Sequence, residues 1–170
     1  MAYLPLSTAN LPDPAIDPAQ GSSPSDYFNT VLYTGNGSTQ SITGVGFQPD
    51  LTWIKKRSGA TDHEIHDAVR GSDFDLRSNL TIAETDQSAS FTGFASDGFT
   101  LAGTVSRYNE SSATYASWNW KANGSGVSNT DGSITSTVSA NTESGFSIVS
   151  YTGTGSNATV GHGLSSAPEM

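Results

Sequence analysis

The chain has 170 residues, among them 18 glycines and no cysteine, and its 16 acidic and 7 basic residues give a formal net charge of −9. Without cysteine, neither a disulfide nor a thiolate metal site can form. The acidic surplus argues against nucleic acid and against an anionic membrane as partners, because both bind through several cationic contacts. Frequent glycine, few charges and the lack of a helical period indicate short strands joined by tight turns.

The first 26 residues form a distinct arm, which contains five of the seven prolines. Each proline removes a backbone donor and favours extended geometry in the residue before it, so the arm is not expected to fold alone. It is either a disordered leader or an extended strap that becomes ordered against a partner, and its apolar content favours the strap. The side chains that we expect to anchor the arm are Tyr3, Leu4, Leu6, Leu11 and Ile16.

From Tyr27 the pattern changes to that of β-strands. The expected strands are 28–33, 40–42, 51–56, 64–70, 90–94, 98–101 and 113–121, while 76–84 is either a strand or a short helical turn. Seven or eight short strands at this spacing predict an antiparallel β-sandwich, similar to a jelly roll, over residues 27–122.

A linker rich in Ser, Gly and Asn, residues 123–132, leads to a second β module that begins at residue 133 and runs to 170. The two modules are related: FNTVLYTGNGS at 28–38 and FSIVSYTGTGS at 146–156 are identical at seven of eleven positions, 118 residues apart. So long a period indicates whole domains, because solenoid repeats run roughly 20–50 residues. The likeness stops before any counterpart of the apolar segment around Trp53. We therefore expect the chain to be the N-terminal part of a longer modular protein.

The only cluster of acids and histidines is the segment 62–67, DHEIHD. It differs from the zinc motif H-E-x-x-H, because His63 and His66 are three residues apart instead of four. The main expectation is a polar strand end with a contact between Asp67 and Arg70, and a three-ligand surface site is the alternative. Since no nucleotide-binding or nucleophile motif is present either, the sequence predicts no catalytic, cofactor or metal site.

The aromatic segment 115–121, YASWNWK, raises the question of sugar binding. Strand alternation places Trp118 and Trp120 on one face, and Tyr115 and Asn119 on the other. The tryptophan face has no polar residue, so we expect it to lie in the core. If this strand contacts a glycan, Tyr115 and Asn119 are then the candidates.

The ordered series of motifs resembles a module of structural proteins of tailed bacteriophages. The motifs that carry the resemblance are YTGNGS at 33–38, GFxPDLxWIK at 46–55, DxxRG at 67–71, SDGFxL at 96–101, YASWNWKA at 115–122, GFSIV at 145–149 and GHGL at 161–164. The resemblance covers about residues 27–170. It implies concanavalin-like jelly-roll sandwiches that recur in tandem in tail fibres and related appendages, without established catalytic residues.

These observations together predict a non-enzymatic virion structural protein without a cofactor, of the tail fibre or appendage type. The arm and the first sandwich would anchor it to other virion proteins, and later modules would attach to a host surface receptor. The resemblance also implies that the chain forms a homo-oligomer, such as a trimer. Two alternatives stay open, a capsid decoration or head-fibre protein and a glycan-binding module.

Overall fold

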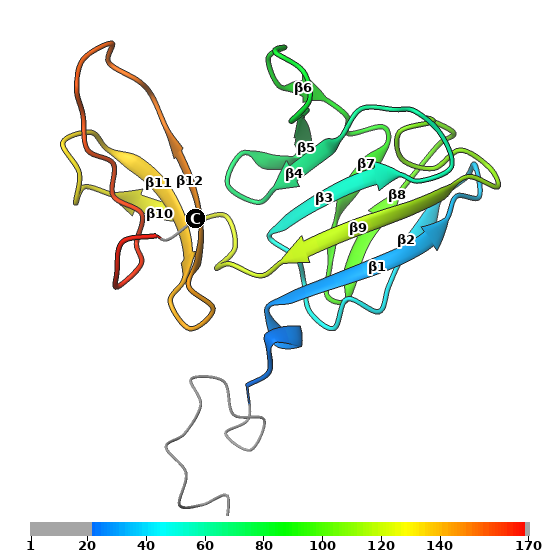
Figure 1. Ribbon diagram of the computed structural model, residues 1–170, viewed down its shortest axis with the longest axis horizontal. Coiled ribbons are helices and arrows are strands. Elements are labelled where there is room, and N and C mark those ends of the chain that lie inside the picture. The colour runs from blue at the N-terminus through cyan, green and yellow to red at the C-terminus, as the bar shows by residue number, and fades with distance from the viewer. Residues whose placement is uncertain (1–21, 169–170) are drawn as a thin grey trace, which may run out of the picture.

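The computed structural model describes residues 22–168, and all of its regular structure except one short 3-10 turn is β-strand (Figure 1). The five predicted anchoring side chains of the arm lie outside the described residues. The elements are η3 (Pro24–Asp26), β1 (Phe28–Thr34), β2 (Gln40–Ile42), β3 (Leu51–Lys56), β4 (Glu64–Asp67), β5 (Gly71–Leu76), β6 (Thr85–Asp86), β7 (Phe91–Ala95), β8 (Gly98–Leu101), β9 (Thr114–Trp120), β10 (Val127–Asn129), β11 (Ser136–Asn141) and β12 (Phe146–Tyr151).

The strands form three sheets, and their pairings are antiparallel as predicted. A six-stranded sheet in the order β1-β9-β3-β4-β5-β6 packs against a three-stranded sheet in the order β2-β8-β7. The core lies between these two sheets and takes side chains from both, such as Ile54 on β3 and Phe99 on β8. A third sheet, β10-β11-β12, lies beside the sandwich at the end where β1 begins and β9 ends (Figure 1).

Strand β9 is central to the larger sheet, and its orientation differs from the prediction. Tyr115 and Asn119 face the core and are fully buried, whereas Trp118 and Trp120 lie on the outer face and are half-buried. The expectation that the tryptophan face fills the core is therefore wrong.

Hydrogen bonds to distant segments explain why the polar face of β9 can be buried. The Asn119 amide oxygen accepts from Thr52 Oγ1 at 3.0 Å, and its Nδ2 donates to the Asn29 carbonyl at 3.1 Å. The Tyr115 hydroxyl donates to the Ser106 carbonyl at 2.8 Å. Buried polar groups with partners of this kind carry little penalty, so the strand can turn its polar face inward.

The repeated sequence forms strand β1 in the sandwich and strand β12 in the third sheet. Both are terminal strands of their sheets, but β1 pairs with β9 whereas β12 pairs with the preceding strand β11. The two copies of the repeated phenylalanine meet on Trp120. Phe28 lies 4.9 Å from its ring by centroid distance, and Phe146 lies 6.1 Å away in a stacked arrangement.

Candidate functional site

The acid–histidine segment supplies the centre of a buried ionic cluster between the two sheets. Glu64 on β4 is fully buried, and its carboxylate accepts a hydrogen bond from the Tyr108 hydroxyl at 2.9 Å. Arg107 Nε lies 2.7 Å from Glu64 Oε1, and Arg77 Nε lies 3.5 Å from Oε2. Burial of the carboxyl and its hydrogen bond to Asp75 raise the pKa of Glu64 to about 7, against the lowering effect of Arg107 and Tyr108.

Asp75 on β5 is the second acid of this cluster, and its surroundings have the opposite effect. Burial alone would raise its pKa, but hydrogen bonds with Glu64, Thr85 and Arg77 lower the pKa to about 2. Arg77 Nε donates to Asp75 Oδ2 at 3.0 Å. Below pH 7 the two acids therefore hold one proton and one charge between them, and the charge is paired with an arginine.

His66 extends the cluster toward the aromatic core. Its ring stacks on Phe91 at a centroid distance of 4.1 Å, with Nδ1 2.7 Å from the Ser72 carbonyl and Nε2 2.9 Å from the Tyr108 hydroxyl. Burial lowers the pKa of His66 to about 4, so the ring is neutral at physiological pH.

The contacts of this ionic cluster link several strands to one another. Arg77 contacts both acids, with its Nε 3.5 Å from Glu64 Oε2 and 3.0 Å from Asp75 Oδ2, whereas the acids of a glycosidase stand roughly 5–9.5 Å apart with a sugar between them. Both carboxyls are buried and paired with arginines. What the arrangement does is connect β4, β5, β6 and the segment before β9.

The outer side of the six-stranded sheet presents a second candidate, the tryptophan face, which we define as Phe28, Leu32, Trp53, Trp118 and Trp120. The register places Trp53 directly opposite Trp118, and their ring centroids are 5.9 Å apart. Phe28 is 40% exposed and Leu32 is 61% exposed. Because the outer side of a two-sheet sandwich is normally polar, this apolar face is the stronger candidate for a contact surface.

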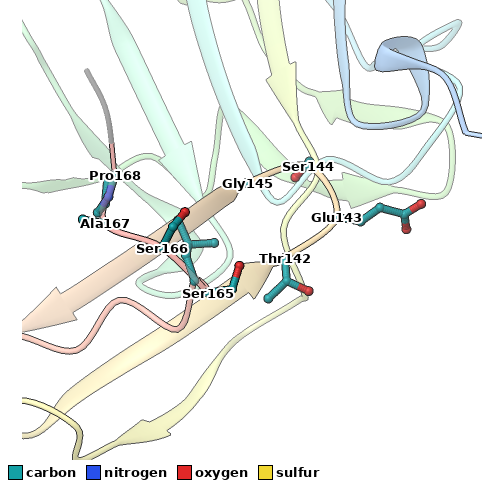
Figure 2. Close-up of a pocket in the computed structure, with 9 residues that line it drawn as sticks. Thr142, Glu143, Ser144, Gly145, Ser165, Ser166, Ala167 and Pro168 are labelled. Atoms are coloured by element: carbon teal, nitrogen blue, oxygen red, sulfur yellow. The ribbon is translucent and has the colours of Figure 1, made fainter. Parts of the chain in front are cut away.

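The third sheet carries a pocket of about 400 Å³ between the β11–β12 turn and the segment 164–168 (Figure 2). Its lining consists of small and hydroxyl side chains together with Leu164 and Pro168, and Glu143 is its one ionisable group. The Glu143 carboxylate points away from Ser165 and Ser166 (Figure 2) and accepts a hydrogen bond from Ser22 Oγ at 2.8 Å. The one ionisable group of the pocket lining is thus engaged by Ser22.

The structure keeps part of the acid–histidine segment together but forms no metal site from it. Glu64 and His66 share one face of β4 as the alternation predicts, and Arg70 Nε contacts the Asp67 carboxylate at 2.6 Å as expected. Within residues 22–168, no group of three or more histidines and acids could hold a metal ion. Tyr115 and Asn119 are buried, so neither side chain can contact a glycan at the surface.

A comparison with protein-family models decides the affiliation of the chain. The model of a domain of unknown function, DUF7483, matches residues 23–170. The chain belongs to the DUF7483 family. No curated protein matches the chain, and no solved structure does.

The DUF7483 match begins one residue before η3 and spans all three sheets. The ionic cluster, the tryptophan face and the pocket all lie inside the DUF7483 region, and the first 22 residues lie outside it. In the part of the chain that the structure describes, no helix is long and apolar enough to cross a membrane.

Proposed function

We propose that this DUF7483 chain is a non-enzymatic structural protein of a tailed-bacteriophage virion. Within the virion it would form a tail fibre or a similar appendage. The observation that carries the proposal is the return of the β1 sequence as β12, at the terminal position of a second sheet. Related β units in tandem are the architecture that the resemblance to phage appendage modules implies. On this proposal the sandwich is a jelly roll of the concanavalin type and the assembly is a homotrimer.

The proline-rich arm has the role of an anchor in this proposal. Its main chain supplies hydrogen bonds and its apolar side chains supply register against another virion protein. Later modules would meet a receptor on the host surface. The pairing of the buried acids Glu64 and Asp75 with arginines supports a function without catalysis.

Labelling of virus particles tests the proposal. A gold-labelled antibody raised against the purified chain is applied to particles of the phage that encodes it, and electron microscopy locates the label. We expect label at the tail. Label spread over the head would replace the appendage by the first alternative, a capsid decoration or head-fibre protein, and particles without label would refute a virion role.

A glycan-binding module remains the second alternative, and one observation favours it. The half-buried rings of Trp53 and Trp118 lie side by side on a sheet face, where sugar rings can stack on them. Titration calorimetry with soluble oligosaccharides tests this, with Trp118→Ala as the binding variant. Val127→Ala is the matched control, because Val127 is 70% exposed on the third sheet.

A further inference from the structure

The sequence contains two Asn-Gly pairs, Asn36-Gly37 and Asn123-Gly124, and both asparagines are exposed. In such a pair the main-chain nitrogen of the glycine can attack the side-chain amide carbon of the asparagine, because glycine has no Cβ to hinder the approach. Exposure alone does not distinguish the two pairs. Their hydrogen bonds do, so the chain carries both a candidate reactive site and a reference site for it.

The first pair, Asn36-Gly37, is held in place by the fully buried Asn109. Asn36 Oδ1 accepts hydrogen bonds from the Ser38 N–H at 2.8 Å and from Asn109 Nδ2 at 3.1 Å. The Gly37 N–H, which would have to become the attacking group, donates to the Asn109 carbonyl at 2.9 Å. Attack within this pair requires these bonds to break first, so the fold protects Asn36.

The second pair, Asn123-Gly124, lies just after β9, where the chain passes from the sandwich to the third sheet. Among residues 22–168, neither the Asn123 carboxamide nor the Gly124 N–H has a hydrogen-bond partner. Gly124 has φ +70°, and the position that a Cβ would take on it has no neighbouring atom within 4 Å. The attacking nitrogen and the amide carbon are therefore both open to water.

The main chain is anchored on both sides of this open pair. The Ala122 N–H donates to Asp50 Oδ2 at 2.8 Å, and the Asn123 N–H donates to Ser139 Oγ on β11, also at 2.8 Å. On the other side, Gly126 lies so close to β11 that an added Cβ would stand 2.9 Å from the Val138 carbonyl oxygen. A chemical change at the pair would therefore act on the junction between the sandwich and the third sheet.

From these contacts we propose that Asn123 is a self-modification site, at which the side-chain amide is converted to a carboxylate. The Gly124 nitrogen loses its proton to the solvent and bonds to Asn123 Cγ, the bond from Cγ to the amide nitrogen breaks, and ammonia leaves. The product is a five-membered succinimide ring. Water then opens the ring at either of its two carbonyl carbons and leaves aspartate or isoaspartate. Overall one water is consumed and one ammonia is released, and no group is oxidised or reduced.

The modification adds a negative charge at the junction of the two β units. In the isoaspartate product the main chain passes through the former side chain, so it is one carbon atom longer between positions 123 and 124. Because the segment is anchored at Ala122 and at Gly126, the longer chain displaces the Asn123 N–H from Ser139 Oγ. The proposal does not rest on the virion function, because the reaction needs only this chain and water.

The rates of the two pairs within one protein test the proposal. The full chain is incubated at mildly alkaline pH, samples are digested with pepsin at acidic pH, and electron-transfer fragmentation locates aspartate and isoaspartate. We expect Asn123 to convert about tenfold or more faster than Asn36, because each hydrogen bond that protects Asn36 slows its reaction by roughly fivefold. In concentrated urea the two sites should convert at similar rates, since both have the sequence Asn-Gly-Ser. Equal rates in the folded protein, or a difference that persists in urea, would overturn the proposal.

Substitution of Asn123 gives a second measurement on the intact protein. Asn123→Gln keeps an amide but requires a less favourable six-membered ring, and it removes no side-chain hydrogen bond within residues 22–168. Asn157→Gln is the matched control, because Asn157 is also exposed but is followed by alanine. On ion exchange we expect a more acidic form to accumulate in wild type and in the control, and much more slowly in Asn123→Gln, with the same circular dichroism at the start. Equal accumulation in all three proteins would place the reaction elsewhere and refute the assignment.

Discussion

Replacing Glu64 by Gln should stabilise the protein above neutral pH, although Glu64 lies near two arginines. The pKa of Glu64 rises from 4.5 to about 7 on folding, mainly because the carboxyl is buried. Between these values the unfolded chain releases a proton that the folded protein keeps, so the stability contributed by Glu64 is complete below pH 4.5 and falls as the pH rises to 7. At about 1.36 kcal/mol per pH unit, the loss amounts to roughly 3 kcal/mol.

Urea denaturation of wild type and Glu64→Gln, from pH 4.5 to 8, measures this loss. Gln resembles the protonated acid, so the two proteins should have similar free energies of unfolding at pH 4.5. Above pH 7, where the wild type must bury a carboxylate, the variant should be more stable by up to about 3 kcal/mol. A variant that is less stable than the wild type by the same amount at every pH would show that Glu64 is ionised throughout, and would refute the reasoning.

His66 supplies the matched comparison, because its effect has the opposite sign. Burial lowers the pKa of His66 from 6.5 to about 4, so the neutral ring contributes stability that is present above pH 6.5 and is lost as the pH falls toward 4. In the wild type the two effects oppose each other between pH 4.5 and 6.5. In Glu64→Gln only the histidine effect remains, and the free energy of unfolding should rise with pH over this range.

Three further substitutions test the packing of the sandwich by chemical denaturation. Trp118→Ala should cost about 1–2 kcal/mol, less than the roughly 3–5 kcal/mol of a fully buried tryptophan, because the ring is half-buried on the outer face; a larger loss would place it in the core. Tyr115→Phe should cost about 1–3 kcal/mol, since the buried hydroxyl has both a donor and an acceptor partner; an unchanged stability would mean that water replaces them. Gly98→Ala should lower the free energy of unfolding much more than Gly93→Ala. Both glycines have φ near +140°, but only at Gly98 would the new methyl group meet the Ile42 carbonyl. Equal losses of stability would show that backbone strain alone causes them.

The bounds of a strand could be predicted from the sequence where the local residue pattern determines them. The segments 51–56 and 98–101 were expected as strands, and β3 and β8 have these bounds. The expected strand 64–70 ends earlier, at Asp67. There the Asp67 carboxylate accepts hydrogen bonds from the backbone N–H groups of Val69 and Arg70 at 3.0 and 2.9 Å, which closes a turn.

The ionic cluster could not be predicted, because its members are scattered along the chain. The sequence places Glu64 and His66 on one face of a strand, and this alternation holds. It gives no sign that Tyr108 donates to Glu64 from 44 residues away. Only the pairing of the strands brings such groups together.

The orientation of β9 shows why hydrophobicity alone misjudges this sandwich. The rule that apolar faces point inward places Trp118 in the core, yet the core accepts Asn119 because Thr52 and Asn29, 67 and 90 residues away, satisfy its amide. With the polar face of the strand satisfied inside, the tryptophans lie on the outside, where other side chains cover them in part: Phe146 stacks on Trp120 at 6.1 Å, and Trp53 Nε1 donates to His63 Nδ1 at 2.9 Å. The face of β9 that is buried is therefore decided by hydrogen bonds from distant segments, which no local pattern in the sequence reveals.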